Sequence, residues 1–171
     1  MSQTEILCGP IGSGKSTYAR HRARQGAIIV NDDAIVMAVH AGIYNLYKKE
    51  LKPLYKCIEN TILQAAIMLG KDVVIDRPNY SKEMRSRYIS IARSLDCKIH
   101  IVFFPEYEPD VHVTRRVTSD IRGMDYQAWM AVFMAHKDNY SKPSLDEADE
   151  ITYLTAQDIK NLQKDEQLFT T

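Results

Sequence analysis

Residues 9–17 read GPIGSGKST and place glycines, a lysine and hydroxyl side chains at the spacing of a phosphate-binding loop, GxxxxGK[ST]. Glycines let successive backbone amide hydrogens turn toward phosphate oxygens, and the following helix presents its positive end to them. Lys15 is predicted to reach the β and γ phosphates of ATP, and Ser16 to ligate Mg²⁺. The nucleotide ligands predicted from this loop are Gly9, Gly12, Ser13, Gly14, Lys15, Ser16 and Thr17.

An ordinary glycine-rich turn is the alternative explanation of this stretch. The preceding residues 5–8 form a short apolar run typical of a strand, and residues 15–25 have helical character up to Gly26. A strand before the loop and a helix after it are the context of a nucleotide-binding loop. This context favours a nucleotide-phosphate site over a simple turn.

Carboxylates follow the next two predicted strands. Asp32 and Asp33 follow residues 27–30 after Asn31, and Asp76 comes at the end of the apolar run 73–75. In an open parallel sheet, ligands bind beyond the carboxyl ends of the strands, so these side chains are predicted to lie beside the glycine loop. A carboxylate there can accept the proton of an attacking hydroxyl while a γ-phosphoryl group moves to it.

Each of these acids has two possible roles. We assign the catalytic base to Asp33 and a substrate contact to Asp32, although Asn31 or Asp32 could instead cap the next helix. Asp76 is predicted to bind Mg²⁺ or to orient the substrate, and the alternative is a turn-forming acid before a proline.

Arginines follow the fourth predicted strand. We expect a lid there over about residues 115–125, in which Arg116 and Arg122 neutralise the charge of the nucleotide phosphates. A solvated helix face is the alternative, and we favour it for Arg115.

Further side chains could contact a substrate. Arg77, next to the acid that ends the third strand, is suitably placed for a substrate phosphate. Tyr44 could stack on a nucleobase or simply cover an edge of the core. Another aromatic group lies at helical spacing and is predicted to be core: Tyr126, Trp129, Met130, Phe133 and Tyr140.

The remaining sequence alternates between strand-like and helix-like segments. Strands are expected at residues 5–8, 27–30, 73–76, 99–104 and 150–154, and helices at residues 15–25, 32–40, 53–69, 81–95, 110–119 and 126–139. The buried stripe of the long helix is predicted to be Tyr55, Ile58, Ile62, Ala65 or Ala66, and Leu69. Strands separated by helices indicate an α/β fold. We predict one domain, residues 1–171, with a three-layer P-loop NTPase fold of the adenylate-kinase-like type and a parallel sheet of about five strands.

The amino-acid composition indicates the class of protein to which the chain belongs. The chain has 171 residues, 45% apolar and 26% charged, which is typical of an ordered globular domain. No apolar run approaches the roughly 18 residues that span a bilayer, and no signal peptide is evident, so a cytoplasmic protein without a membrane partner is expected. The three cysteines form no CxxC pair, so we expect buried thiols rather than disulfides or a zinc site.

The distribution of charge and the lack of a guanine-reading motif exclude some classes of nucleotide-binding protein. The net charge is zero, with acids concentrated after residue 144 and an excess of bases before it. This suits a phosphate-bearing ligand at a local site better than a long nucleic-acid track. The NKxD element that reads guanine in GTPases is missing, and a mechanical ATPase is normally larger. Of the P-loop protein classes considered, a small kinase with ATP and Mg²⁺ as cofactors fits best.

The motifs together resemble the kinase domain of phage-type 5′-hydroxyl polynucleotide kinases. That family carries G-x-x-G-S-G-K-S-T, then N-x-D-x-x-R after the second strand, an acidic strand end followed by T-N or a similar pair, and an Arg-Gly in a lid. The corresponding segments here are GPIGSGKST, Asn31-Asp32-Asp33-Ala34-Ile35-Val36, Asp76-Arg77-Pro78-Asn79 and Arg122-Gly123.

The resemblance implies a role for each matching position. Asp33 would be the general base, Lys15 and Ser16 would bind phosphate and Mg²⁺, and Arg122 would contact the transferring phosphoryl group. Asn79 would join the substrate contacts. The acceptor would be a nucleic acid or a nucleotide.

One position departs from the family pattern. Where the family has an arginine that contacts a substrate phosphate, this chain has Val36, and a valine cannot hold a phosphate. A nucleoside, a sugar or a hydroxymethylated base in DNA is therefore the alternative acceptor. A nucleotide-binding regulator without transferase activity is a further alternative. The sequence does not indicate an oligomeric state.

Overall fold

The computed structural model describes residues 2–167, so residues 1 and 168–171 of the predicted domain lie outside the described residues. Five parallel strands form one sheet in the order β2-β3-β1-β4-β5. Their bounds are β1 (Gln3–Cys8), β2 (Ile28–Val30), β3 (Val73–Ile75), β4 (Lys98–Phe103) and β5 (Glu150–Tyr153). The predicted α/β fold and its five-stranded parallel sheet are confirmed.

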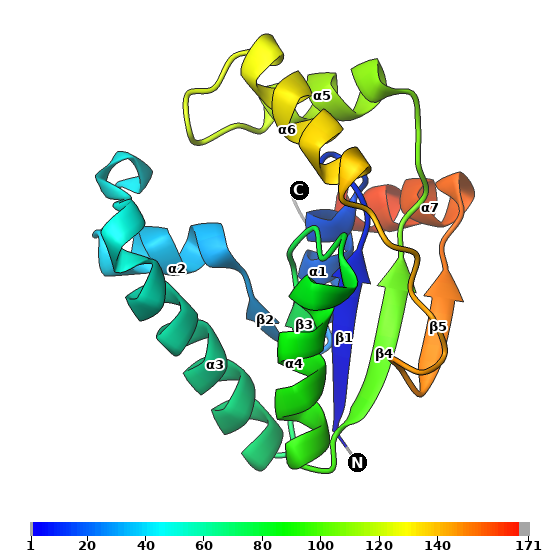
Figure 1. The fold of residues 1–171 in the computed structure, drawn as a ribbon. Helices are drawn as coiled ribbons and strands as arrows, with labels where there is room; N and C mark the ends of the chain where they lie inside the picture. The colour runs from blue at the N-terminus through cyan, green and yellow to red at the C-terminus, as the bar shows by residue number, and fades with distance from the viewer. Residues whose placement is uncertain (1, 168–171) are drawn as a thin grey trace.

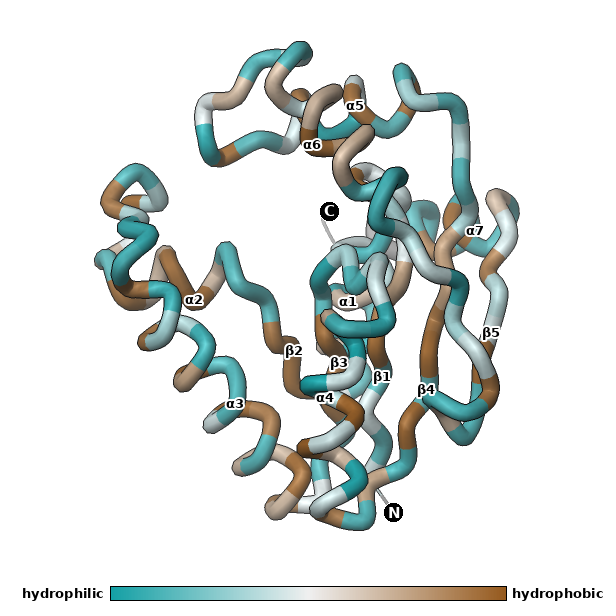
Figure 2. The backbone as a smooth tube through the Cα atoms, viewed as in Figure 1, coloured by the Kyte–Doolittle hydropathy of each residue, from teal (hydrophilic) through white to brown (hydrophobic). Residues whose placement is uncertain are grey.

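Helices cover both faces of the sheet (Figure 1). One face packs against α3 (Lys52–Met68) and α4 (Lys82–Ser94), and the other against α1 (Lys15–Arg24) and α7 (Ala156–Gln167). The central strands are hydrophobic on both sides because each face is covered, and the three residues of β3 are completely buried (Figure 2).

Two further units lie beyond the carboxyl ends of the strands. The first, which we call the lid, consists of α5 (Pro109–Thr118), α6 (Tyr126–Asp138) and the loop between them. The second, which we call the arm, consists of α2 (Asp32–Val39), the 3-10 turns η1 (Tyr44–Leu46) and η2 (Lys49–Leu51), and the start of α3. Figure 1 shows the lid and the arm on opposite sides of the space above the sheet. The predicted lid segment, residues 115–125, is the last turn of α5 and the loop that follows it.

Several features differ from those predicted from the sequence. The helix α7 was not predicted. On α3, the buried residues are Tyr55, Glu59, Leu63, Ala66 and Ile67, while Leu69, just after the helix, is 75% exposed. The buried face therefore includes a carboxylate, which an apolar pattern cannot reveal. Cys8 and Cys97 are buried as expected, but Cys57 is exposed on the outer side of α3.

No helix within residues 2–167 has both the length and the apolar character needed to cross a bilayer.

Candidate active site

The glycine loop connects β1 to α1 and packs tightly against the lid and α7. Gly12 and Gly14 have φ values of 65° and 104°, in the left-handed region that favours glycine. A Cβ on Gly12 would lie 2.3 Å from the backbone oxygen of His112 in α5, and a Cβ on Gly14 would lie 2.9 Å from Ile159 Cγ2 in α7. The loop thus needs glycine for its curvature and for close contact with both helices.

Lys15 folds back over this loop. Its ammonium donates to the carbonyl oxygens of Gly9 and Pro10 at 3.0 and 2.5 Å, and to Ser13 Oγ at 3.3 Å. Burial lowers the pKa of Lys15 to about 8, although the nearby Asp76 carboxylate favours the charged form. Lys15 is therefore a buried cation whose only bonds are to neutral oxygens of the loop, among the contacts recorded for residues 2–167.

Ser16 and Asp76 meet at the carboxyl edge of the sheet. The Ser16 hydroxyl lies beside the Asp76 carboxylate and favours its charged form, and Asn31 Nδ2 donates to Asp76 Oδ2 at 3.1 Å. Burial raises the pKa of Asp76, while Lys15 opposes this shift. Asn31 also caps α2, since its side chain accepts the backbone N–H of Ala34. The capping role foreseen for Asn31 is thus present and is combined with a bond to Asp76.

Asp33 is bound by the lid. Arg122 Nη2 lies 2.5 Å from Asp33 Oδ1, and Arg116 Nη2 lies 3.3 Å from Oδ2. The Tyr44 hydroxyl also lies near Asp33, and burial together with this carboxylate raises the pKa of Tyr44 to about 12. The arm and the lid therefore meet at one carboxylate, which joins α2, η1, α5 and the lid loop.

Both lid arginines lie over the same indole. Arg116 Cζ is 4.4 Å and Arg122 Cζ is 5.4 Å from the centre of the Trp129 ring. Of the group predicted as core, Trp129 and Phe133 are buried in one cluster with Ile11 and Val113, whereas Tyr140 is 41% exposed, so its assignment to the core was wrong. The contact with the arginines was missed because helical spacing shows only that a residue faces inward.

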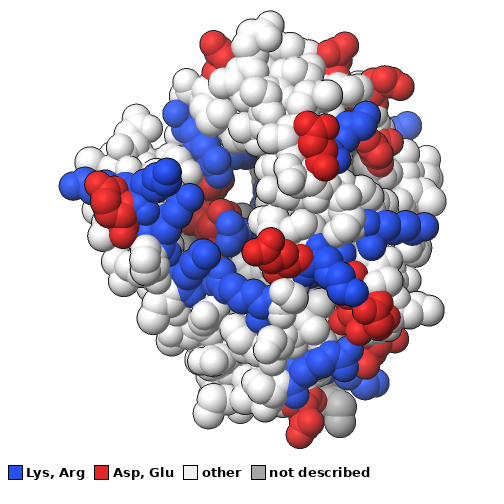
Figure 3. Space-filling view, in the orientation of Figure 1, with Lys and Arg blue, Asp and Glu red and all other residues white. Residues whose placement is uncertain are grey.

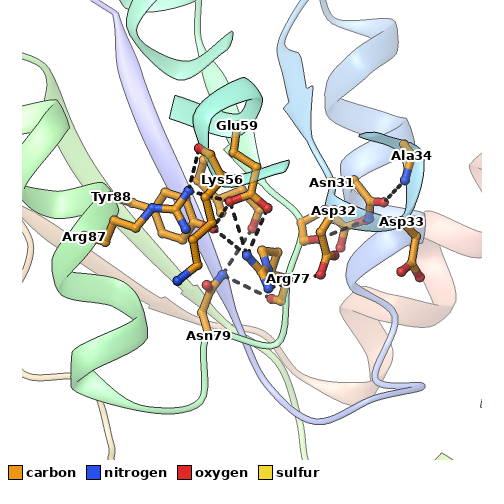
Figure 4. Close-up of polar contacts among 12 residues, drawn as sticks. Asn31, Asp32, Asp33, Ala34, Lys56, Glu59, Arg77, Asn79, Arg87 and Tyr88 are labelled. Carbon is orange, nitrogen blue, oxygen red and sulfur yellow. Dashed lines mark hydrogen bonds and ion pairs between the residues drawn. The ribbon is translucent and has the colours of Figure 1, made fainter. Parts of the chain in front are cut away.

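Asp32 belongs to a separate network (Figure 4). Arg77 Nη2 lies 3.1 Å from Asp32 Oδ2, and Arg77 Nη1 donates to Glu59 Oε1 at 3.0 Å. Arg87 and Tyr88 complete the set, because both donate to the same buried Glu59. Burial raises the pKa of Asp32, while Arg77 favours its charged form. Glu59, missed by the sequence pattern, is thus the residue that holds Arg77.

Two positions of the family motif do not face the cleft. Asn79 is completely buried and has a φ of 46°, and its amide nitrogen donates to the carbonyl oxygen of Leu7 at 2.8 Å. It ties the loop after β3 to β1, so we do not carry it forward as a substrate contact. Val36 is 3% exposed and packs in the core under α3.

A cleft of about 560 Å³ lies between the glycine loop, the arm and the lid. The predicted residues that line it are Gly12, Gly14, Lys15, Ser16, Thr17, Asp32, Asp33, Asp76, Arg77, Arg116 and Arg122. Lining residues that the sequence analysis did not assign to the site include Arg20, Tyr80, Trp129, His136 and Gln163. The space-filling view shows this hollow with basic and acidic side chains around it (Figure 3).

Comparisons with known proteins agree with this arrangement. A search of curated protein sequences gave no significant match. Among solved structures, a proposed kinase from Chloroflexus aurantiacus J-10-fl is 14% identical with a TM-score of 0.69, covering 97% of each chain. The APS kinase of Mycobacterium tuberculosis is 16% identical with a TM-score of 0.58, covering 99% of this chain and 98% of that one.

A chain of the Pnkp1/Rnl/Hen1 RNA repair complex is 18% identical with a TM-score of 0.63. The match covers 82% of this chain but only 46% of that one. At these identities the likeness establishes the fold. The family model described as AAA domain, AAA_33, matches residues 5–143. Because this match spans most of the chain, the protein belongs to the AAA domain family AAA_33, and its fold is that of the P-loop kinases.

Proposed function

We propose that this protein is an ATP- and Mg²⁺-dependent phosphotransferase that moves the γ-phosphoryl group to a hydroxyl, with the 5′-hydroxyl of a polynucleotide as acceptor. In this proposal residues 1–171 act as one kinase domain. The observation that supports it is the lining of a single cleft by Lys15, Ser16 and Asp76 on the loop side and by Asp33 with two lid arginines on the other.

The residues divide the reaction between them. Asp33 takes the proton of the acceptor hydroxyl as its oxygen bonds to the γ-phosphorus, and the bond from that phosphorus to the bridging oxygen of the departing ADP breaks. Lys15 and the arginines at 116 and 122 stabilise the negative charge that spreads over the phosphoryl oxygens. Asp33 must exchange its arginine partners for the acceptor hydroxyl before it can accept the proton.

The residues present also fit Mg²⁺. This ion is commonly held by one or two carboxylates, a hydroxyl and the substrate phosphates. Ser16 and Asp76 supply such oxygens side by side in the cleft, beside the glycine loop. The bound ion would supply positive charge that neutralises the phosphates.

A polynucleotide acceptor is supported by the surface of the arm. Lys48, Lys49, Lys52 and Lys56 are all exposed there, opposed locally by Glu50. Figure 3 shows basic side chains gathered on this side of the hollow. Exposed lysines attract a phosphate backbone. Two structural neighbours of the same fold, the RNA repair complex and a fungal RNA kinase, are named for RNA.

A small hydroxyl acceptor is the second candidate. It is favoured by Val36, since this position lies in the core and offers no cation to a substrate phosphate. Arg77 lines the cleft and could replace that arginine, but Asp32 and Glu59 already hold it.

Transfer of a labelled γ-phosphate decides between these acceptors. The panel contains a 5′-hydroxyl oligonucleotide, a nucleoside, a sugar and DNA with a hydroxymethylated base. We expect label on the oligonucleotide, dependent on Mg²⁺ and lost in Asp33→Asn. Label only on a small sugar would remove the polynucleotide proposal. A regulator without transferase activity would transfer no label and would keep its effect in Asp33→Asn while losing it in Lys15→Ala.

A further inference from the structure

We propose that Trp129 is a positioning residue for phosphoryl transfer, whose indole holds the guanidinium groups of Arg116 and Arg122 over the cleft. This rests on the proposed kinase function. Nothing in the sequence pattern assigns Trp129 more than a place in the core.

The contacts join three separate segments of the lid. Arg116 comes from the last turn of α5, Arg122 from the loop, and Trp129 from the first half of α6. Trp129 is 1% exposed and lines the cleft, so one part of its ring belongs to the core and another to the site. Attraction between a cation and an aromatic face is stronger when water is excluded, and tryptophan is the strongest aromatic partner.

Electrostatics explains why an aromatic residue is useful at this position. Two guanidinium groups that bind the two oxygens of one carboxylate lie close together, and both are positively charged. Their mutual repulsion needs compensation. Asp33 provides it in the structure, but Asp33 must release the arginines before it can act as a base. Trp129 is the partner that stays with the lid, and its electron-rich face continues to hold both cations.

The indole positions the Arg122 guanidinium, while other bonds hold the backbone of the lid loop. Within the loop, Asp120 accepts the backbone N–H of Arg122 at 3.0 Å and that of Met124 at 2.6 Å, so the backbone is fixed locally. These bonds fix the backbone from which the Arg122 side chain extends. The position of its guanidinium is fixed by Asp33 and the indole, together with the Tyr44 ring of the arm, whose centre lies 5.2 Å from Arg122 Cζ. Loss of the indole is therefore expected to release the Arg122 guanidinium while the turn held by Asp120 remains.

The first experiment uses the natural protein's single tryptophan as a reporter. Its emission is measured without nucleotide in wild type, Arg116→Ala, Arg122→Ala and Arg115→Ala. Arg115 is the matched control, because its guanidinium lies over Tyr107 at 4.6 Å instead. We expect a changed emission maximum or intensity in the first two variants and the wild-type spectrum in the third. Wild-type spectra in both Arg116→Ala and Arg122→Ala would overturn the proposed contact.

The second experiment measures its kinetic effect. Trp129→Leu removes the aromatic face and is expected to lower kcat/KM for ATP about tenfold, whereas Trp129→Phe keeps a face and stays within about threefold of wild type. Phe133→Leu is the control for core packing, since Phe133 is equally buried but stacks on His112. It should retain wild-type kinetics after the folded fraction is matched by circular dichroism.

The outcomes separate the two proposals. Equal losses in Trp129→Leu and Trp129→Phe, or the same loss in Phe133→Leu, would show that the ring serves packing alone and would overturn the positioning role. If no acceptor is phosphorylated by the wild-type protein, the kinase function fails, and the emission spectra still report whether the indole holds the arginines.

Discussion

Arg122 and Asp33 form an ion pair of 2.5 Å across the cleft, so the lid holds the carboxylate to which we assign the base. The second lid arginine, Arg116, binds the other oxygen of the same carboxylate. Both cations are also the groups expected to neutralise phosphate charge. Asp33 and the nucleotide therefore compete for the same arginines, and this competition leads to the first prediction.

Asp33→Asn is expected to strengthen ATP binding several-fold while it lowers kcat by about 10² to 10⁴. The neutral amide holds the lid arginines less firmly, so less energy is needed to move them to the phosphates. Calorimetry with a non-hydrolysable ATP analogue and steady-state kinetics measure the two effects. Asp32→Asn is the control, because Asp32 pairs with Arg77, and its ATP affinity should match wild type. Weaker ATP binding in Asp33→Asn would contradict the competition.

The pKa of Lys15 predicts how ATP affinity depends on pH. Burial places this pKa at about 8 in the protein without ligand, and a bound phosphate raises it by favouring the charged form. Binding then requires uptake of a proton once the pH exceeds about 8. ATP affinity is expected to fall as the pH rises from 8 to 9.5.

Calorimetry in buffers with different ionisation enthalpies measures the affinity and this proton uptake together. Lys15→Arg should lose the dependence between pH 8 and 9.5, because arginine stays protonated there. An affinity that is constant over this range in wild type would show that Lys15 is already fully charged.

Gly14→Ala is expected to destabilise the protein more than Gly26→Ala. Both glycines have left-handed φ values, 104° and 94°, so each alanine carries about 1 kcal/mol or more of backbone strain. Only Gly14 adds a steric clash, with Ile159 at 2.9 Å, while a Cβ on Gly26 meets nothing within 4 Å. Chemical denaturation gives both free energies of unfolding. Equal free energies of unfolding in the two variants would mean that α7 can shift away from the added methyl group without loss of stability.

Glu59→Gln is expected to lower the free energy of unfolding by about 3 kcal/mol, because it leaves Arg77 and Arg87 without their buried counter-ion. The KM for the acceptor should also rise, since Arg77 loses the partner that orients it beside Asp32. The exposed pair Lys82–Asp146 offers a control, and Asp146→Asn should leave the unfolding midpoint unchanged. A stable Glu59→Gln protein with unchanged kinetics would show that Tyr88 and Asp32 suffice to hold Arg77.

Local sequence patterns predicted the sheet and the glycine loop, because these depend on short apolar runs and on one fixed spacing. They did not predict α7, whose sequence AQDIKNLQKDEQ is mostly polar. Its buried Ile159 packs beside the glycine loop, so the helix depends on tertiary contact more than on its own pattern.

The partners within the site could not be predicted for a similar reason. Asp33 and Arg122 are 89 positions apart, and Arg87 lies 28 positions from Glu59. No periodicity in a single sequence connects such residues. The pattern also treats every inward position as apolar, so a buried carboxylate such as Glu59 is assigned to the solvent side of its helix.

The packing of Ile159 on Gly14 makes the last described helix a thermodynamic partner of the nucleotide loop. The coupling is reciprocal: a ligand that orders the loop also holds α7 in place, and any change that detaches α7 lowers the affinity for that ligand by the same factor. Amide exchange in α7 therefore reports on how fully the loop is occupied.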